Sequence, residues 1–278
     1  MSNESLPKKV AVGRICFTVF MWILGLLTLY PFVSMVVIAF RPAGLAYRPL
    51  FYPAVPVLDN FATVVSHPNF LNWSRNTIVT VVVAIVFRLI VTLPAAFAFA
   101  RLQFRGSKVL MMIFMLTLVI PSETTMVPRY LYYKSLGLFD SLFAIILPEL
   151  SEVFYLMLLT QFFQAIPRDL NEAACIDGAS QLRILCGIYV PLSGPAVATT
   201  VLFSFINIWN NFLDPYLFIS SIDRQLLTPA LKYFQERGGA DVPVQLAGSA
   251  IAIIPIILLF IFTQRYFVEG ITSSGVKG

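Results

Sequence analysis

Residues 15–40 read ICFTVFMWILGLLTLYPFVSMVVIAF, a stretch without a single charged side chain. A helix that crosses the hydrocarbon core of a bilayer needs about 20 largely apolar residues, and this stretch supplies them. Lys8, Lys9 and Arg14 precede it, as basic residues precede the apolar region of a signal peptide. That region, however, is only about 7–15 residues long and ends in a small-residue cleavage site. We therefore expect an uncleaved membrane-spanning helix.

The composition extends this expectation to the whole chain. Of the 278 residues, 58% are hydrophobic and 12% are charged. Soluble domains contain about 45–50% apolar and about 25% charged residues. This balance excludes a cytosolic enzyme, a disordered protein and a disulfide-stapled secreted domain. Five further apolar segments follow the first, at about residues 77–100, 109–127, 141–163, 192–218 and 246–267.

These segments are continuous rather than alternating, so they predict helices and not the shorter strands, of about 9–11 residues, of a membrane barrel. A helix satisfies its own backbone hydrogen bonds, as the bilayer interior requires. We therefore expect an all-α integral membrane protein with six transmembrane helices over residues 15–267. Residues 1–14 and 268–278 are expected to form short tails.

Basic residues predict the orientation and exclude one class of partner. Six spans place both termini on the same side, and the short connection from Arg101 to Lys108 on that side is rich in basic residues. Short cytoplasmic loops carry an excess of Lys and Arg, so we expect cytoplasmic termini in a bacterial inner membrane. The net charge of +5 comes from residues scattered between apolar runs, which suits contact with membrane lipid and not with nucleic acid.

Residues for metal or nucleotide chemistry are scarce. The cysteines are Cys16, Cys175 and Cys186, the single histidine is His67, and no arrangement resembles a zinc site. The phosphate-binding pattern G-x-x-x-x-G-K-[ST] does not occur. Neither a histidine cluster nor a nucleophile–base pair supports a membrane enzyme. We expect a non-catalytic subunit without a metal or cofactor of its own, which receives energy through a partner.

The loop at about residues 164–191 carries the most specific signal. Residues 167–191 read PRDLNEAACIDGASQLRILCGIYVP. Asp169 and Glu172 have the spacing of a capping box, which predicts a helix from Leu170. Gly178 is the expected left-handed stop, and Ser180 can cap a second helix that runs towards Pro191. Local structure alone leaves open that this segment is only an interfacial connector.

The order of residues in this loop resembles the EAA motif of ABC importer permeases. The matching residues are Glu172, Ala173, Ala174, Asp177, Gly178, Ala179, Ile188 and Pro191, and Val190 stands where leucine is usual. The resemblance covers nearly the whole chain. Residues 95–101, 209–212 and 264–270 look like the carbohydrate-uptake, maltose-permease-like branch, whose members depend on a solute-binding protein.

This resemblance implies a type I ABC importer permease fold with a cytoplasmic coupling helix, working by alternating access. It implies a second homologous permease chain, two ATP-binding subunits that hold ATP and Mg, and an extracytoplasmic solute-binding protein. The residues implied in coupling to the ATPase are Glu172, Ala173, Ala174, Asp177, Gly178 and Pro191. Lys277 and Gly278 are expected either to contact the ATPase or to form a frayed terminus.

Polar residues in the fifth apolar segment share one helical face. Thr200, Ser204, Asn207, Asn211 and Asp214 follow spacings of three and four, and Trp209 flanks them. Amides exchange hydrogen bonds with sugar hydroxyls, and an aromatic ring can stack on a pyranose. The stripe is expected to line a translocation path or to form hydrogen bonds between helices. The candidate path residues are Ser204, Asn207, Trp209, Asn211 and Asp214.

Charged residues within the second and fourth apolar segments need partners. Arg88, Glu149 and Glu152 lie within apolar runs, where an unpaired charge costs about 2.5–3.5 kcal/mol. Both segments are expected to run inward, so Arg88 and Glu152 reach a similar depth. We expect a structural ion pair between Arg88 and Glu152, with path lining as the alternative.

The sequence thus favours uptake of a sugar or sugar-like solute by an ATP-driven, binding-protein-dependent importer. A permease for a glycerol-phosphate compound or another polar solute is the alternative within this class. A proton-coupled secondary transporter is the alternative from another class, because Glu149 and Glu152 could relay protons. The loop around Gly178 argues against it.

Overall fold

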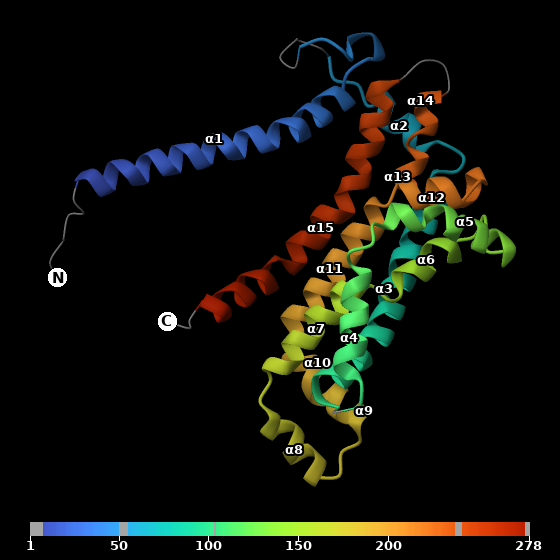
Figure 1. Ribbon diagram of the computed structural model, residues 1–278. Helices are drawn as coiled ribbons and strands as arrows, with labels where there is room; N and C mark the ends of the chain where they lie inside the picture. Colours follow the sequence, from blue (N-terminus) through green and yellow to red (C-terminus); the bar gives the residue numbers. More distant parts are fainter. Residues whose placement is uncertain (1–7, 50–54, 103, 237–240, 276–278) are drawn as a thin grey trace. The chain divides into compact units, whose positions relative to one another are not determined.

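The computed structural model describes residues 8–49, 55–102, 104–236 and 241–275, and the regular structure in these ranges is helical, without strands. The chain divides into two compact units. Unit 1 comprises residues 1–67 and 231–251, and unit 2 comprises residues 68–230 and 252–278. Figure 1 gives the element labels.

Unit 1 contains α1 (Lys8–Ala39), η1 (Ala43–Leu45), α2 (Asp59–Val65), α14 (Tyr233–Glu236) and the first part of α15 (Val242–Gly275). The amide of Asn60 donates to the carbonyls of Ala39 and Arg41, at 2.7 and 2.8 Å, and so satisfies backbone groups at the end of α1. Large apolar side chains of α1, among them Phe17 and Trp22, are exposed in the chain by itself. This exposure suits a helix surrounded by lipid or by another membrane chain.

Unit 2 is a helical bundle organised around α3 (Phe70–Arg101). α3 packs along α7 (Val153–Ala165) and also contacts α6 (Phe143–Glu149) and α11 (Gly194–Asn210). α4 (Ser107–Thr117) packs against α7. The remaining elements of the unit are η2 (Ser122–Thr125), α5 (Met126–Ser135), α8 (Arg168–Ile176), α9 (Gln181–Ile184), η3 (Leu185–Tyr189), α10 (Val190–Leu192), α12 (Leu213–Phe218), η4 (Ile222–Arg224) and α13 (Leu227–Ala230).

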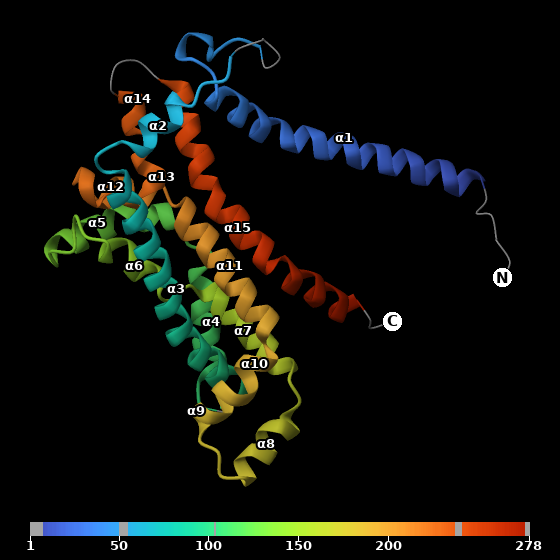
Figure 2. The same cartoon turned by 180° about the vertical axis from the view of Figure 1, so that it is seen from behind.

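Two apolar clusters lie at opposite ends of this bundle. One includes Phe97 of α3, Phe163 of α7 and Tyr189 of η3, near the end that carries α8. The other includes Tyr133 of α5 and Phe218 of α12. Figures 1 and 2 agree that α8 lies at the end of unit 2 opposite α5 and α12.

Four helices are long and apolar enough to cross a membrane, and two further helix pairs reach that length only if each bent pair is one span. The described residues therefore agree with up to six spans. The four helices are 13–39, 70–101, 143–165 and 242–264. The second and sixth predicted segments lie within α3 and α15, and the first lies within α1 except for its last residue, Phe40.

The third and fifth predicted segments are not straight, and this corrects the sequence analysis. The third bends by 89° where α4 ends at Thr117, because Pro121 adopts an extended backbone before η2. The fifth begins at Gly194, at an 82° bend after α10, and ends at Asn210. Asn211 is extended, so α12 is a separate short helix. The fourth segment also breaks, between Glu149 and Val153.

Candidate functional site

The loop singled out by its sequence forms an elbow, defined here as residues 167–180. Gly178 ends α8 with a left-handed backbone (φ +77°), and its N–H donates to the carbonyl of Cys175 at 3.1 Å. The N–H of Ala179 donates to the carbonyl of Ala174 at 3.0 Å. This is the glycine stop expected from the sequence, and a side chain with a Cβ would be strained there.

The start of α8 differs from the prediction. The helix begins at Arg168, two residues earlier than expected, and no side chain caps its first turn, so Asp169 and Glu172 do not form a capping box. Pro167 precedes the helix, and its ring pre-sets the backbone for a turn at this point. The second cap agrees with the prediction, because the Ser180 hydroxyl accepts the N–H of Arg183 at 3.4 Å.

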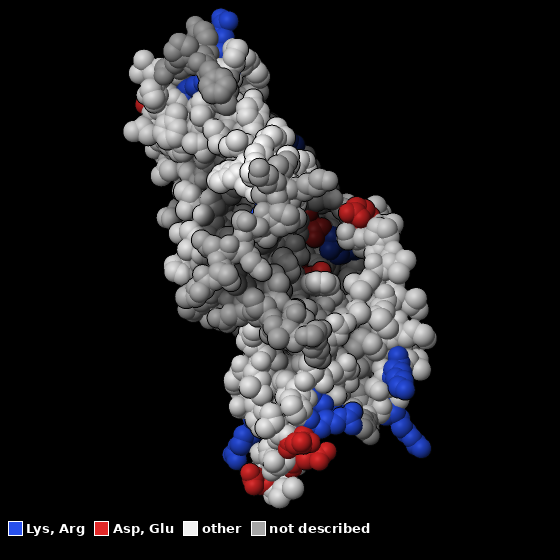
Figure 3. Space-filling model, turned by 90° about the vertical axis from the view of Figure 1, so that its left-hand side faces the viewer, with Lys and Arg blue, Asp and Glu red and all other residues white. Residues whose placement is uncertain are grey.

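The elbow presents a mixed surface. Glu172, Ala173 and Asp177 are exposed, whereas Ala174 packs against the apolar cluster at this end of the bundle. Ile176 is 87% exposed at the tip of α8, and the sequence analysis did not single it out. Figure 3 shows acidic and basic side chains gathered at this end of the molecule. An apolar tip flanked by charges suits contact with another protein.

Arg101 links α3 to the end of α7 directly before the elbow begins. It stands at the end of α3 and donates to the carbonyls of Phe163, at 2.6 Å, and Ile166, which lie in and after the last turn of α7. These carbonyls lack partners within their own helix. The guanidinium also lies 5.3 Å from the ring centre of Tyr189 in η3. One side chain therefore links α3, α7 and η3.

A π-turn follows the elbow and was not predicted. Residues Leu185–Tyr189 form η3, directly before Pro191 in α10. Pro191 cannot donate to the carbonyl of Gly187, and its ring crowds that carbonyl, which accounts for the widened turn. Pro191 itself is exposed.

A second candidate site is a cavity of about 540 Å³, called here the polar cavity. The ends of α4 and α6, the start of α12 and parts of η2, α5 and α11 line it. Figure 3 shows a hollow in one face of the molecule with acidic and basic side chains inside it. The charged lining residues are Glu123, Arg129, Glu149, Glu152 and Asp214, and the lining amides are Asn207 and Asn211.

Arg88 lies fully buried behind this cavity and joins three elements. Its Nε donates to the carbonyl of Glu149 at 2.6 Å, its Nη2 to the carboxylate of Glu149 at 2.5 Å, and its Nη1 to the Ser204 hydroxyl at 2.5 Å. The predicted contact with Glu152 is present at 3.3 Å. Glu149 is nevertheless the closer partner, which the sequence analysis had not assigned. The guanidinium also lies 4.4 Å from the ring centre of Tyr155.

This arrangement explains why the fourth span tolerates a break. The segment between α6 and α7 leaves backbone carbonyls without helical partners, and the Arg88 side chain satisfies that of Glu149. The two carboxylates of Glu149 and Glu152 share a single guanidinium.

Arg129 and Asp214 form a second ion pair on the cavity wall, between α5 and α12. Asn211 supports the pair, because its Oδ1 accepts the Asp214 N–H at 3.2 Å and its Nδ2 donates to the carboxylate at 3.3 Å. Arg129 also lies 4.8 Å from the ring centre of Phe218. Spacing along the chain does not predict this pair, because Arg129 and Asp214 lie on different helices, 85 residues apart.

The predicted polar stripe divides into two groups. Asn207, Asn211 and Asp214 line the polar cavity. Ser204 is fully buried and accepts a hydrogen bond from Arg88, so it lies behind the wall.

Trp209 also lies away from the cavity, which corrects its predicted place beside a path. It is 4% exposed, its Nε1 donates to the carbonyl of Ala252 at 2.9 Å, and its ring stacks on Phe205 at 5.1 Å. Its indole therefore packs between helices of the bundle.

Asp140 organises the loops at the end of the bundle opposite the elbow. It has a positive φ of 59°, and its carboxylate accepts the backbone N–H groups of Ser220 and Ser221, at 3.0 and 2.9 Å, and the Ser221 hydroxyl at 2.5 Å. Arg224 pairs with it at 3.4 Å. Partial burial raises the pKa of Asp140, but the bonds from Ser221 and Ser220 and the charge of Arg224 outweigh this and hold that pKa below its usual value.

Two further expectations from the sequence concern the C-terminal residues and metal binding. Lys277 and Gly278 lie outside the described residues. Within the residues that the structure describes, no group of three or more His, Cys, Asp or Glu side chains could hold a metal ion.

Comparison with known proteins points to one family. The family described as "Binding-protein-dependent transport system inner membrane component" matches residues 90–273. The chain is 31% identical to the arabinooligosaccharides transport system permease protein AraQ of Halalkalibacterium halodurans, over 92% of this chain and 93% of that protein. It is 28% identical to the diacetylchitobiose uptake system permease protein DasC of Streptomyces coelicolor, over 98% of this chain and all (100%) of that protein.

A solved structure shares the fold. It is the crystal structure of a bacterial ABC transporter involved in the import of the acidic polysaccharide alginate. The superposition has a TM-score of 0.83 with 25% sequence identity, and it covers 95% of this chain and 100% of that chain.

Proposed function

Because this chain belongs to the family of binding-protein-dependent transport system inner membrane components, we propose that it is the permease subunit of an ATP-driven importer for a sugar or sugar-like solute. The observation that carries the proposal is the polar cavity, where two amides and an ion pair face one space. Relatives named for oligosaccharide transport support the choice of solute.

The chemistry of the polar cavity suits a hydroxylated solute. Asn207 and Asn211 can donate to and accept from hydroxyl groups, and Arg129 and Asp214 offer charged donors and acceptors. A volume of about 540 Å³ lies within the range of about 300–1,000 Å³ found for small-molecule sites. These side chains can replace the water that a sugar loses on entry.

The charge of this wall argues against the glycerol-phosphate alternative. Glu123, Glu149, Glu152 and Asp214 line the cavity, and Arg129 is the single basic residue among the described lining residues. Arg129 is already paired with Asp214. A phosphate group would meet more negative than positive charge.

The partners of the permease follow from the same proposal. The family description itself names dependence on a binding protein. We assign the remaining parts as a second homologous permease chain and two ATP-binding subunits, in which ATP and Mg would be held. The elbow would then face the cytoplasm, together with both termini, and the loops around Asp140 would face the solute-binding protein.

Coupling is assigned to the elbow. Glu172, Ala173, Asp177 and the tip of α8 are exposed for contact with an ATP-binding subunit. A displacement of the elbow would reach α3 and α7 through Arg101. Arg88 of α3 donates to Glu149, and Tyr155 of α7 accepts a hydrogen bond from Asn207. Glu149 and Asn207 line the polar cavity, so ATP-driven movement at one end could open or close the space at the other.

The test is transport by the reconstituted complex. The permease would be purified with its partners, placed in proteoliposomes with the solute-binding protein, and supplied with labelled neutral oligosaccharides. We expect uptake that needs ATP on the elbow side and continues when the proton gradient is collapsed. Uptake that follows the proton gradient and ignores ATP would establish the secondary-transporter alternative instead.

A further inference from the structure

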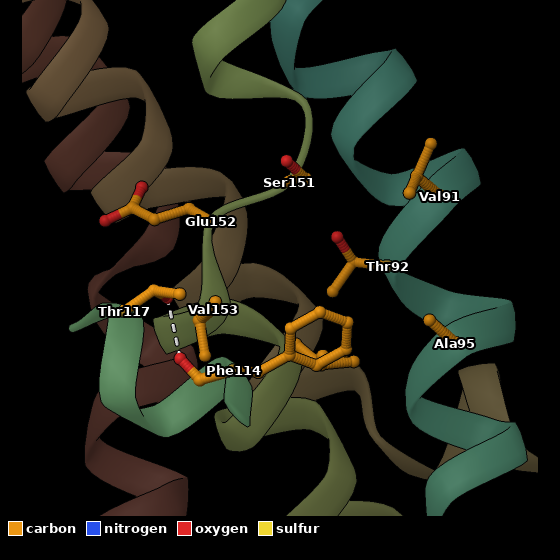
Figure 4. Close-up of a pocket in the computed structure, with 9 residues that line it drawn as sticks. Val91, Thr92, Ala95, Phe114, Thr117, Ser151, Glu152 and Val153 are labelled. Atoms are coloured by element: carbon orange, nitrogen blue, oxygen red, sulfur yellow. Dashed lines mark hydrogen bonds between the residues drawn. The ribbon is translucent and has the colours of Figure 1, made fainter. Parts of the chain in front are cut away.

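A second, smaller cavity adjoins the polar cavity. It has a volume of about 380 Å³ and lies between α3, α4 and the segment that leads into α7. Figure 4 shows Thr92 on α3, Phe114 on α4 and Ser151 around this space. Thr117 and Glu152 line both cavities, so the two spaces meet at these side chains. We call the smaller space the Phe114 cavity.

Thr92 is the unusual residue of this cavity. It is 3% exposed, and none of the hydrogen bonds among the described residues involves its hydroxyl. Buried Thr160 and Thr200 behave differently, because each donates to the carbonyl four residues earlier, at 2.6 and 2.9 Å. The Thr92 hydroxyl therefore remains available as a donor and acceptor for a molecule in the cavity. In Figure 4 the Thr92 oxygen points from α3 towards the space.

The other walls are mostly apolar. Val91, Ala95, Val153 and Leu156 contribute aliphatic surface, and Phe114 contributes an aromatic ring. The Thr117 hydroxyl is already used, because it donates to the carbonyl of Phe114 at 2.7 Å. A mostly apolar cavity with a few directed polar groups is the usual composition of a small-molecule site.

We propose that the Phe114 cavity is a second solute subsite, which takes one sugar ring of the solute as it passes the shared edge at Thr117 and Glu152. The C–H face of the ring would pack on Phe114, and a ring hydroxyl would bond to Thr92. The inference rests on the proposed function, because it places the same class of solute in the next space along the bundle. Continuity with the polar cavity and the unpartnered Thr92 hydroxyl favour this occupant over a lipid chain, which offers no hydrogen bond.

The first experiment removes the hydroxyl without changing the shape. Thr92→Val and Thr92→Ser would be compared in the reconstituted complex, with Thr160→Val as the matched control, because Thr160 is equally buried but lines neither cavity. The loss of one neutral hydrogen bond predicts a rise in KM for uptake of about three- to tenfold for Thr92→Val. Thr92→Ser and Thr160→Val should stay close to the parent. Equal effects of Thr92→Val and Thr160→Val would overturn the subsite.

The second experiment does not depend on transport. Cys16, Cys175 and Cys186 would first be replaced by serine in the full complex. Thr92→Cys and Thr160→Cys would then be treated with a small water-soluble methanethiosulfonate, with and without maltotriose, arabinotriose or diacetylchitobiose. We expect at least about fivefold faster modification at position 92 than at position 160, and protection at position 92 by a saccharide.

The outcomes separate this inference from the proposed function. Uptake of a saccharide that does not protect position 92 overturns the subsite alone and indicates a recess filled by water or lipid. Protection by a saccharide that is not taken up supports the subsite and contradicts transport of that sugar. Absence of modification at position 92 under all conditions overturns the subsite, whether or not uptake occurs.

Discussion

At the residue scale, Arg88 determines how charge is held inside the bundle. The guanidinium is fully buried and pairs with Glu149 at 2.5 Å and with Glu152 at 3.3 Å. Removing one partner of a buried pair leaves the other charge uncompensated, at a cost of about 3–5 kcal/mol. We expect Arg88→Gln to lower the unfolding temperature of the purified complex strongly. Arg224→Gln is the control, because its pair is half exposed and such pairs contribute about 0–1 kcal/mol.

A double substitution tests the pairing itself. Arg88→Gln combined with Glu149→Gln removes both charges, so its cost should be clearly smaller than the sum of the two single costs. The measurement is thermal unfolding of the three variants in one detergent. Purely additive losses would show that Arg88 and Glu149 act independently.

Asp140 gives a prediction about pH. Its pKa is lower in the folded chain than its ordinary value of 3.8, so its contribution to stability is complete above that value and is lost as the pH falls through the folded pKa. We expect the parent to be more stable than Asp140→Asn at pH 6, and the difference to shrink below about pH 4. Unfolding temperatures of both proteins from pH 6 to pH 3 measure it. A difference that is constant over this range would contradict the assigned role of the carboxylate.

At the scale of elements, the elbow offers a matched comparison between two glycines. Gly178 and Gly106 both have positive φ, +77° and +85°, and neither has a neighbouring atom within 4 Å of an added Cβ. An alanine therefore introduces about 1–2 kcal/mol of similar backbone strain at each, without a clash. We expect Gly178→Ala, and more strongly Gly178→Asp, to reduce ATP hydrolysis stimulated by the binding protein, whereas Gly106→Ala does not. Equal effects at both positions would mean that strain alone matters.

The elements also show how far sequence patterns reach. Hydropathy located the four helices that are long enough to cross a membrane and the two bent helix pairs. The glycine stop at Gly178 and the Ser180 cap followed from local chemistry. Hydropathy did not predict the bends at Pro121 and Gly194, because a run of apolar residues has the same hydropathy whether its helix is straight or broken. Arg129 and Glu149 were missed as partners because spacing along one helix does not reveal which neighbouring helix lies opposite.

At the scale of the whole molecule, the two candidate sites lie at different positions along one bundle. The elbow is at one end of the bundle. The polar cavity lies next to Arg88 and the residues that it binds, Glu149, Glu152 and Ser204. α3 connects them, because it carries Arg88 in its middle and Arg101 at its end. This arrangement allows a movement at the elbow to change the cavity without any residue contacting both sites.

The charge of the polar cavity predicts which solutes the assembled importer accepts. Its wall carries four carboxylates and one arginine among the described lining residues, and Arg88 behind the wall offsets one more charge, which leaves an excess of about two negative charges. A negative charge about 10 Å from one such excess charge loses about 1.7 kcal/mol at an effective dielectric constant of about 20. This corresponds to more than tenfold weaker binding of a uronate oligosaccharide in the polar cavity than of a neutral oligosaccharide of the same length.

The measurement is competition against uptake of a labelled neutral oligosaccharide by proteoliposomes at constant ionic strength. An unlabelled neutral trisaccharide should compete at least about tenfold better than an alginate trisaccharide, and Glu152→Gln should narrow the gap, because it removes a carboxylate that lines both cavities. The binding protein also selects solutes, so its affinity for each trisaccharide has to be measured separately. The ratio of the two competition constants is then divided by the ratio of the two binding-protein affinities, which leaves the preference of the permease. If the permease shows no remaining preference for the neutral trisaccharide, or if Glu152→Gln leaves that preference unchanged, the wall charge does not select the solute.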